Sequence, residues 1–159
     1  MNQQFTYHRA VAPLMWVFVA IASVELVVTH LLVATFFGTR IAMVLSVVTA
    51  ASVLWLILAI RAMRRLPVEL DAERLVMRSG RIKQVEVPAA TVAGIETTFD
   101  AASLKDGVTL NLALIAYPNV VVVLDPPYPG RRRSIRRIAH RLDDPASFAQ
   151  AIERLVVAR

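Results

Sequence analysis

The sequence predicts a two-helix membrane hairpin followed by a small α+β domain. Residues 11–37 and 41–60 form two long apolar stretches, and the chain behind them changes to alternating apolar and polar positions. About 20 apolar residues cross a hydrocarbon core that is about 30 Å thick. Only helices satisfy their backbone polar groups within one segment, so each stretch is expected to be a helix.

A short reversal around Gly38 and Thr39 separates the two stretches, which makes the helices antiparallel neighbours. The first apolar run continues well past the length of a signal-peptide core, so we interpret it as a retained anchor. The chain then divides into an N-terminal tail (1–10), a hairpin (11–62) and a soluble domain (66–159).

Basic residues near the ends of the spans predict their orientation. On the side of the tail and the linker these residues are Arg9, Arg61, Arg64 and Arg65, whereas Arg40 alone lies at the turn. Because Lys and Arg are retained in the cytoplasm, both termini are expected to be cytoplasmic. After residue 65 the chain holds 13 basic and 11 acidic residues. This balance argues against a nucleic-acid partner, which would favour a generally basic face.

The first part of the soluble domain predicts short strands. Residues 75–78 and 84–87 alternate in polarity on either side of Ser79-Gly80, which is typical of a β-hairpin. Pro88 ends that run, because proline donates no hydrogen bond to a sheet. Residues 92–97 form a short further strand.

The rest of the domain predicts more strands and one terminal helix. Residues 109–115 alternate, and residues 120–124 form an apolar run typical of a strand covered on both faces. Residues 134–142 fit a strand or a helix. Asp144 can cap a helix that begins at Pro145, with an apolar stripe along it. We therefore expect a small, strongly bent antiparallel sheet closed by a C-terminal helix.

The pattern Arg-Leu-Val-Met-Arg-Ser-Gly at 74–80, then Val-Glu-Val-Pro at 85–88, Val92 and Ile-Glu at 95–96, resembles the bacterial pleckstrin-homology-like (PH-like) membrane proteins. Those proteins typically place one or two membrane helices before such a domain. The resemblance implies a PH-like barrel in the inner membrane of a bacterium, with a scaffolding or partner-binding role and no fixed catalytic residues. Eukaryotic relatives hold phosphoinositides on a basic loop, whereas the matching loop here, 71–73, is acidic.

Glu25 and His30 are ionisable residues inside the first span. A charged residue at a helix centre costs about 2.5–3.5 kcal/mol on insertion scales, and such residues usually face a protein interior. Counting outward from the turn places Glu25 at the depth of Ser52, and His30 near Ser46 and Thr49. In a structural interpretation Glu25 and His30 bond to Ser52, to Thr49 or to each other and lock the hairpin.

In a functional interpretation Glu25 and His30 form a proton path, or a metal or haem ligand that another subunit completes. Their spacing puts them about 140° apart on the helix, so the two do not form a chelate by themselves. We predict no metal site and no resident cofactor within the chain. A row of small residues permits close helix contact and self-association. It consists of Ala42, Ser46 and Ala50.

A second candidate site is a cluster of five arginines that follows the proline-rich loop 125–130. It consists of Arg131, Arg132, Arg133, Arg136 and Arg137. Together with Arg64 and Arg65 of the linker, the cluster is predicted to contact anionic lipid, at about 1 kcal/mol per basic residue. The alternative is a solvated basic loop that only reinforces the orientation.

No nucleophile, base and orienting group can be named together, so we expect a non-enzymatic protein. The leading hypothesis is an inner-membrane hairpin that anchors a cytoplasmic PH-like domain, which binds a protein partner or the lipid surface. Anchoring raises the local concentration of the domain at the membrane. The rival hypothesis is a small subunit of a membrane complex in which Glu25 or His30 handles protons, a metal or a cofactor.

Overall fold

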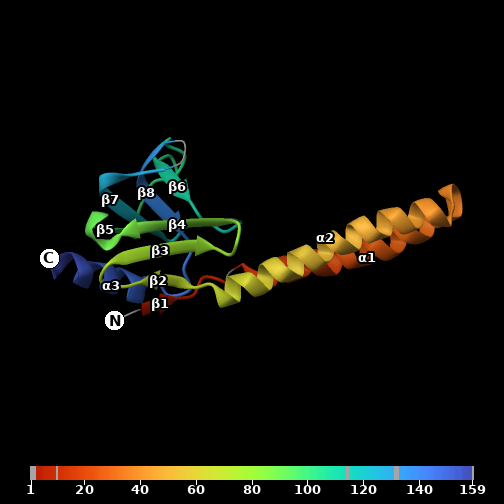
Figure 1. Ribbon diagram of the computed structural model, residues 1–159, viewed down its shortest axis with the longest axis horizontal. Helices are drawn as coiled ribbons and strands as arrows, with labels where there is room; N and C mark the ends of the chain where they lie inside the picture. The colour runs from red at the N-terminus through yellow and green to blue at the C-terminus, as the bar shows by residue number, and fades with distance from the viewer. Residues whose placement is uncertain (1–2, 10, 114, 131–132, 159) are drawn as a thin grey trace.

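A computed structural model describes residues 3–9, 11–113, 115–130 and 133–158. It consists of a long helical hairpin that leads into a domain of two sheets and a C-terminal helix (Figure 1). The sequence prediction of two apolar helices before an α+β domain is therefore confirmed at this level.

The hairpin is formed by α1 (Ala12–Phe37) and α2 (Thr39–Arg65), which lie side by side (Figure 1). Gly38 alone separates them and has a positive φ of 91°, which suits a residue without a Cβ. Thr39 already belongs to α2, and α2 continues past the predicted end at residue 60. Both helices are long and apolar enough to cross a membrane.

The contact between the two helices is narrow. Ala42 is fully buried against α1, and Ser46 is half-buried on the same face of α2. Ala50 is exposed, so only the first two residues of the predicted small-residue row contribute to helix contact within the hairpin. Four residues on from Ser46, the helix has rotated by about 40°, which carries Ala50 off the seam.

The first sheet has the strand order β1-β2-β3-β4 and is antiparallel throughout. Its strands are β1 (Gln3–Phe5), β2 (Val68–Leu70), β3 (Arg74–Ser79) and β4 (Lys83–Pro88). The predicted hairpin is the β3–β4 pair, and Pro88 is its last residue. The prediction of residues 1–10 as a separate tail differs from the structure, because β1 pairs with β2. Three residues are too short to display a strand pattern in the sequence.

The second sheet has the order β5-β7-β8-β6. Its strands are β5 (Val92–Glu96), β6 (Thr109–Asn111), β7 (Val120–Pro129) and β8 (Ser134–His140), and a short 3-10 helix, η1 (Ala89–Thr91), precedes β5. The pair β6–β8 is parallel, so the prediction of an entirely antiparallel sheet is wrong at this pair.

Two further expectations are resolved in the second sheet. The segment that fitted either a strand or a helix is a strand, β8. Residues 125–129 of the predicted loop 125–130 instead form the second half of β7, which pairs with β8 again at Tyr128 after a shift of register beyond Val123. Prolines are tolerated at such irregular positions because a bulged strand leaves some backbone groups unpaired.

The helix α3 (Pro145–Val157) closes the domain, as predicted. The Asp144 side chain accepts hydrogen bonds from the Ser147 hydroxyl and from the Ser147 backbone N–H, and these two bonds lower the pKa of Asp144. The bond from the backbone N–H caps the helix. Phe148 and Ile152 are fully buried, and the ring of Phe148 lies edge-on to that of Phe5 at 4.9 Å. The helix therefore packs against the N-terminal strand as well as the second sheet.

The segment between β1 and α1 is also fixed to the domain. The Asp143 backbone N–H donates to the Thr6 carbonyl (2.9 Å), and its carboxylate accepts from the Arg9 backbone N–H (3.0 Å). Both ends of the hairpin are thus attached to one folded body. Strand β1 and the domain must consequently lie on the same side of any membrane that the hairpin crosses.

Candidate functional site

His30 and Ser46 form a polar contact between the two helices, about two turns from Gly38. His30 Nδ1 lies 2.7 Å from Ser46 Oγ, and both side chains are half-buried between α1 and α2. The depth count from the turn anticipated this neighbourhood. Within the described hairpin it is the side-chain hydrogen bond that joins the two helices.

Glu25, unlike His30, does not lie between the two helices. Its side chain is exposed on the hairpin surface and makes no hydrogen bond or ion pair with any described residue. The hydroxyls of Thr49 and Ser52 donate instead to carbonyls of their own helix, those of Leu45 and Val48. The expected bond between Glu25 and Ser52 is therefore not formed, because both side chains point away from the seam.

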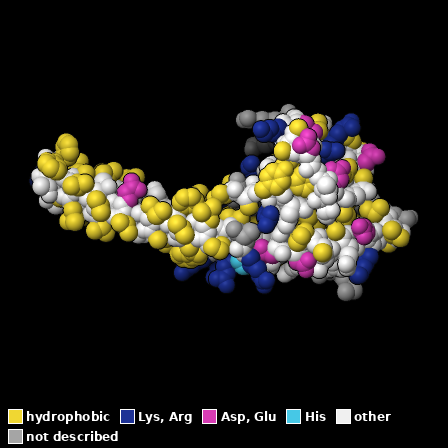
Figure 2. All heavy atoms as spheres, turned by 180° about the vertical axis from the view of Figure 1, so that it is seen from behind, with side chains coloured by type: hydrophobic (Ala, Val, Ile, Leu, Met, Phe, Trp, Pro, Cys, Tyr) yellow, Lys and Arg dark blue, Asp and Glu magenta, His cyan; other side chains and the backbone are white. Residues whose placement is uncertain are grey.

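The hairpin surface around these residues is almost wholly apolar, with an acidic group in its middle (Figure 2). A groove of about 370 Å³ runs along one side between α1 and α2. It is lined by Leu26, Val27, His30, Leu31, Met43, Ser46, Val47 and Ala50. Across the described residues, no three His, Asp or Glu side chains come together as a metal site would need.

Basic side chains gather where the hairpin joins the domain (Figure 2). We call this set the junction cations, and it consists of Arg9, Arg61, Arg64, Arg65, Arg81 and Lys83. All six are exposed, and none forms an ion pair within the described part of the chain. Of this set, the sequence predicts lipid contact only for Arg64 and Arg65.

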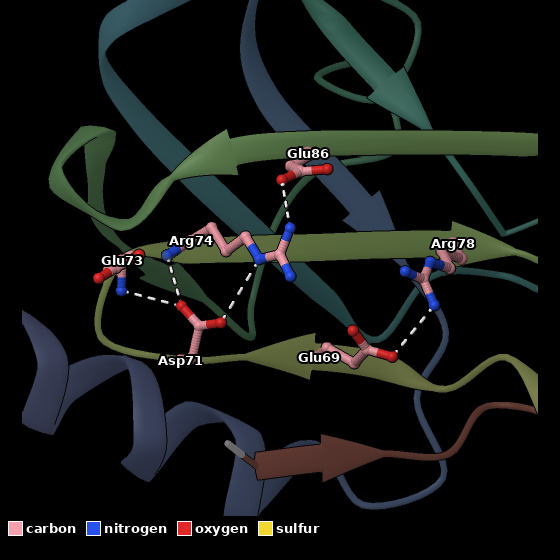
Figure 3. Close-up of polar contacts among 6 residues, drawn as sticks. All are labelled: Glu69, Asp71, Glu73, Arg74, Arg78 and Glu86. Carbon is pink, nitrogen blue, oxygen red and sulfur yellow. Dashed lines mark hydrogen bonds and ion pairs between the residues drawn. The ribbon is translucent and has the colours of Figure 1, made fainter. Parts of the chain in front are cut away.

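Basic residues on the outer face of the first sheet are arranged differently. Arg74 contacts Glu86 at 2.8 Å and Asp71 at 3.5 Å, and Arg78 contacts Glu69 at 3.1 Å (Figure 3). The Glu86 carboxylate raises the pKa of Arg74. Arg74 and Arg78 therefore have acidic partners, whereas the junction cations have none among the described residues.

The acidic loop between β2 and β3 has a structural role. Asp71 Oδ1 accepts hydrogen bonds from the backbone N–H groups of Arg74 and Glu73, which lower the pKa of its carboxyl (Figure 3). This loop contributes no free cation to an anionic ligand.

The predicted arginine cluster is divided by the structure. Arg131 and Arg132 lie outside the described residues. The guanidinium of Arg133 donates to the Thr109 carbonyl (3.0 Å), and that of Arg137 lies 3.5 Å from Glu96. Arg136 is exposed. The end of β7 and the start of β8 lie at the top of the domain in Figure 1, away from the base of α2.

A second groove of about 340 Å³ lies between the last turns of α2 and the turn that joins β3 to β4. We call it the junction groove. It is lined by Trp55, Leu58, Ala59, Ala62, Met63, Gly80, Arg81 and Ile82. In Figure 1 the β3–β4 turn is the part of the first sheet that reaches toward the hairpin.

Local contacts hold the β3–β4 turn against α2. Gly80 has a positive φ of 58°, a conformation that favours glycine, and it lies close to Met63 of α2. Its backbone N–H donates to the Tyr7 hydroxyl (2.7 Å), which in turn donates to the Leu66 carbonyl (2.9 Å). Tyr7 thereby ties the turn to the end of α2.

His140 completes this anchor from β8. Its ring is 2% exposed, its Nε2 donates to the Arg78 carbonyl (2.7 Å), and its Nδ1 accepts from the Arg141 backbone N–H. Burial lowers the pKa of His140 to about 4, so the ring is neutral in this arrangement. The ring also lies 4.9 Å from that of Tyr7.

Sequence reasoning missed the junction groove, because it combines residues from α2 with residues from a distant turn. The usable signals were Trp55 near the end of the second apolar run, and the exposed sequence Arg-Ile-Lys at 81–83. Comparison of the chain with protein-family models, curated proteins and solved structures finds no match in any of the three.

Proposed function

We propose that this chain is a non-enzymatic membrane-anchored module. Its hairpin crosses the inner membrane of a bacterium with both termini in the cytoplasm, and its domain, which we assign to the PH-like class, rests on the anionic membrane surface. There the domain presents its exposed strand edges to a protein partner by strand addition.

The observation that carries the proposal is the contrast between two groups of cations. The junction cations lack acidic partners, whereas Arg74 and Arg78 on the outer face of the domain are paired. Unpaired cations at the base of an apolar hairpin are placed where anionic head groups would supply the counter-charge. Each cation near such a surface contributes about 1 kcal/mol.

The position of the junction cations also supports the orientation. Lys and Arg flanking membrane spans are retained in the cytoplasm. Arg61, Arg64 and Arg65 follow the apolar part of α2, and Arg9 precedes α1. Since β1 belongs to the same sheet as β2, tail and domain share one side, and the positive-inside rule assigns that side to the cytoplasm.

The test uses the full chain reconstituted in lipid nanodiscs, and the absence of cysteine makes single labels simple. A spin label on Gln84→Cys, beside the β3–β4 turn, is compared with one on Glu153→Cys, on the exposed face of α3. We expect the first label to report the head-group region in nanodiscs containing phosphatidylglycerol, and the second to remain in water.

Raising the salt concentration, or replacing Arg61, Arg64 and Arg65 together with Gln, should move the first label toward water. Recovery of the chain from a detergent-free soluble extract would contradict the proposal. So would a label at position 84 that ignores both lipid charge and salt.

Glu25 supports a second candidate function, that of a small subunit in a membrane complex. Its carboxylate has no partner within the described hairpin and lies on an apolar surface. Ionisable groups within membranes almost always face protein or a water-filled cavity. A further helix, from another subunit or a second copy, would provide that partner.

The matched pair Glu25→Gln and Val24→Gln tests this candidate, since both side chains are exposed on α1. If Glu25 bonds a partner helix, a crosslinked product that forms in native membranes should disappear in Glu25→Gln and persist in Val24→Gln. Identical crosslinking of the unmodified chain and Glu25→Gln would remove the support for this function.

A further inference from the structure

We propose that the junction groove binds one anionic phospholipid, with the phosphate at Arg81 and an acyl chain along Trp55 and Leu58. This inference rests on the proposed function, because it requires the hairpin to cross the membrane. It adds a defined lipid site to what would otherwise be a diffuse attraction between the domain and the membrane surface.

The groove has the size and the chemistry for such a ligand. Its volume of about 340 Å³ falls at the lower end of the range for small-molecule sites, about 300–1,000 Å³. One wall is apolar and comes from α2, through Leu58, Ala59 and Ala62. The other wall is the β3–β4 turn, which brings Arg81, so one side suits hydrocarbon and the other an anion.

The depth of the groove agrees with the position of a lipid head group. Trp55 is 61% exposed on α2, and tryptophan is enriched at the level where hydrocarbon meets head groups. Arg61, six residues or about 9 Å further along α2, lies toward the domain, where an arginine suits the aqueous side. The groove spans the same stretch of the helix, and so it straddles the boundary that a phospholipid also straddles.

The β3–β4 turn is built to stay at this depth. Ile82 is 48% exposed at its tip, with Arg81 on one side and Lys83 on the other. Ile82 can contact the acyl chains of the lipid at the tip of the turn. The charges of Arg81 and Lys83, which have no ion-pair partner among the described residues, can then lie at the phosphates. The bonds from Gly80 to Tyr7 and from Tyr7 to Leu66 hold the turn in place before any lipid arrives.

The two tryptophans of the chain provide an internal control. Trp55 lines the groove, whereas Trp16 lies exposed on α1 and does not line it. Trp16→Phe leaves Trp55 as the sole reporter, and Trp55→Phe leaves Trp16. Each single-tryptophan full chain is reconstituted in phosphatidylcholine nanodiscs that contain a minor fraction of brominated lipid, which quenches tryptophan on contact.

We expect brominated phosphatidylglycerol to quench Trp55 at a lower mole fraction than brominated phosphatidylcholine, by about five-fold for one cation that meets a head group of net negative charge. Trp16 should show a smaller preference, because it reports only the general attraction of the junction cations. Arg81→Gln should reduce the preference at Trp55 to that at Trp16, while the matched control Arg136→Gln, an exposed arginine on β8, should leave it unchanged.

Equal quenching of Trp55 by the two lipids would overturn the proposed site. So would a preference at Trp55 that stays above that at Trp16 in Arg81→Gln, because Arg81 would then not be its source. In both outcomes the two tryptophans are still quenched, so the membrane anchor stands. If neither tryptophan is quenched by either lipid, the hairpin does not cross the bilayer and the proposed function fails together with the site.

Discussion

The hairpin and the domain bury their apolar side chains to very different extents. In the domain, Leu75, Met77 and Phe148 are fully buried in a continuous core. In the hairpin, large apolar residues such as Leu32 and Val44 remain more than half exposed. The domain therefore carries its own stabilising core in water, whereas the hairpin depends on apolar surroundings for its outer surface.

Polar contacts follow the same division. The domain joins distant segments through several side-chain hydrogen bonds, including that from the Ser79 hydroxyl to the Leu112 carbonyl across the two sheets. In the described hairpin, the contact between His30 and Ser46 is the polar link between the helices. The domain should consequently respond strongly to single substitutions and to pH, and the hairpin weakly.

The largest effect is expected from the domain core. Phe148→Ala should lower the free energy of unfolding of the domain by about 3–5 kcal/mol, because it removes a fully buried ring and leaves a cavity. The matched change in the hairpin, Leu32→Ala, should have a much smaller effect. Urea unfolding of the full chain in nanodiscs, followed by near-ultraviolet circular dichroism, compares the two. Equal losses of unfolding free energy in Phe148→Ala and Leu32→Ala would contradict the difference between the domain and the hairpin.

The second largest effect is the loss of domain stability at acid pH. The pKa of His140 is about 4 in the folded domain, against 6.5 for the ordinary side chain. Between these values the unfolded chain binds a proton that the folded chain does not, so stability falls as the pH is lowered from 6.5 to 4. The loss should approach about 3 kcal/mol at pH 4.

His140→Gln separates this effect from general acid denaturation. Its amide nitrogen can still donate to the Arg78 carbonyl, but the side chain does not titrate in this range. The variant should be less stable at pH 7 and should show a flatter decline down to pH 4. A decline as steep as that of the unmodified chain would exclude His140 as the cause.

The smallest effect is expected inside the hairpin. Ser46→Ala removes the hydroxyl that contacts His30 and should destabilise the hairpin by about 0.6 kcal/mol, the average for hydrogen bonds between membrane helices. Ser52→Ala is the control, because its hydroxyl bonds within its own helix. Force-induced unfolding of the hairpin from a bilayer can resolve the difference. If Ser46→Ala matches Ser52→Ala, the contact adds no stability.

The parts of the fold that could be predicted depend on local pattern. The hairpin follows from the length of two apolar runs, and the position of His30 near Ser46 and Thr49 follows from counting outward from Gly38 and Thr39. Strand β1 could not be predicted, because three residues carry almost no periodic signal. The alternation at 109–115 predicted a strand, but only Thr109–Asn111 forms one, and its parallel pairing could not be predicted. The positions of these two strands are decided by partners far away in the chain.

The candidate site shows the same limit. The depth of Glu25 could be counted, but its direction depends on how α1 is rotated against α2, which packing decides. The junction groove required the β3–β4 turn to be placed beside α2, and that placement depends on Tyr7 and His140 together. The sequence shows the chemistry of each side chain, but the tertiary contact between distant segments could not be predicted from it.

The pairing of β1 with β2 has a consequence for how the protein is made. Strand β1 cannot join its sheet until the hairpin and β2, which follow it in the chain, have been synthesised. If the hairpin is inserted in a bilayer as proposed and only one helix crosses, β1 and β2 lie on opposite faces and cannot pair. In that topology, the β1–β2 pairing requires an even number of crossings between the two strands.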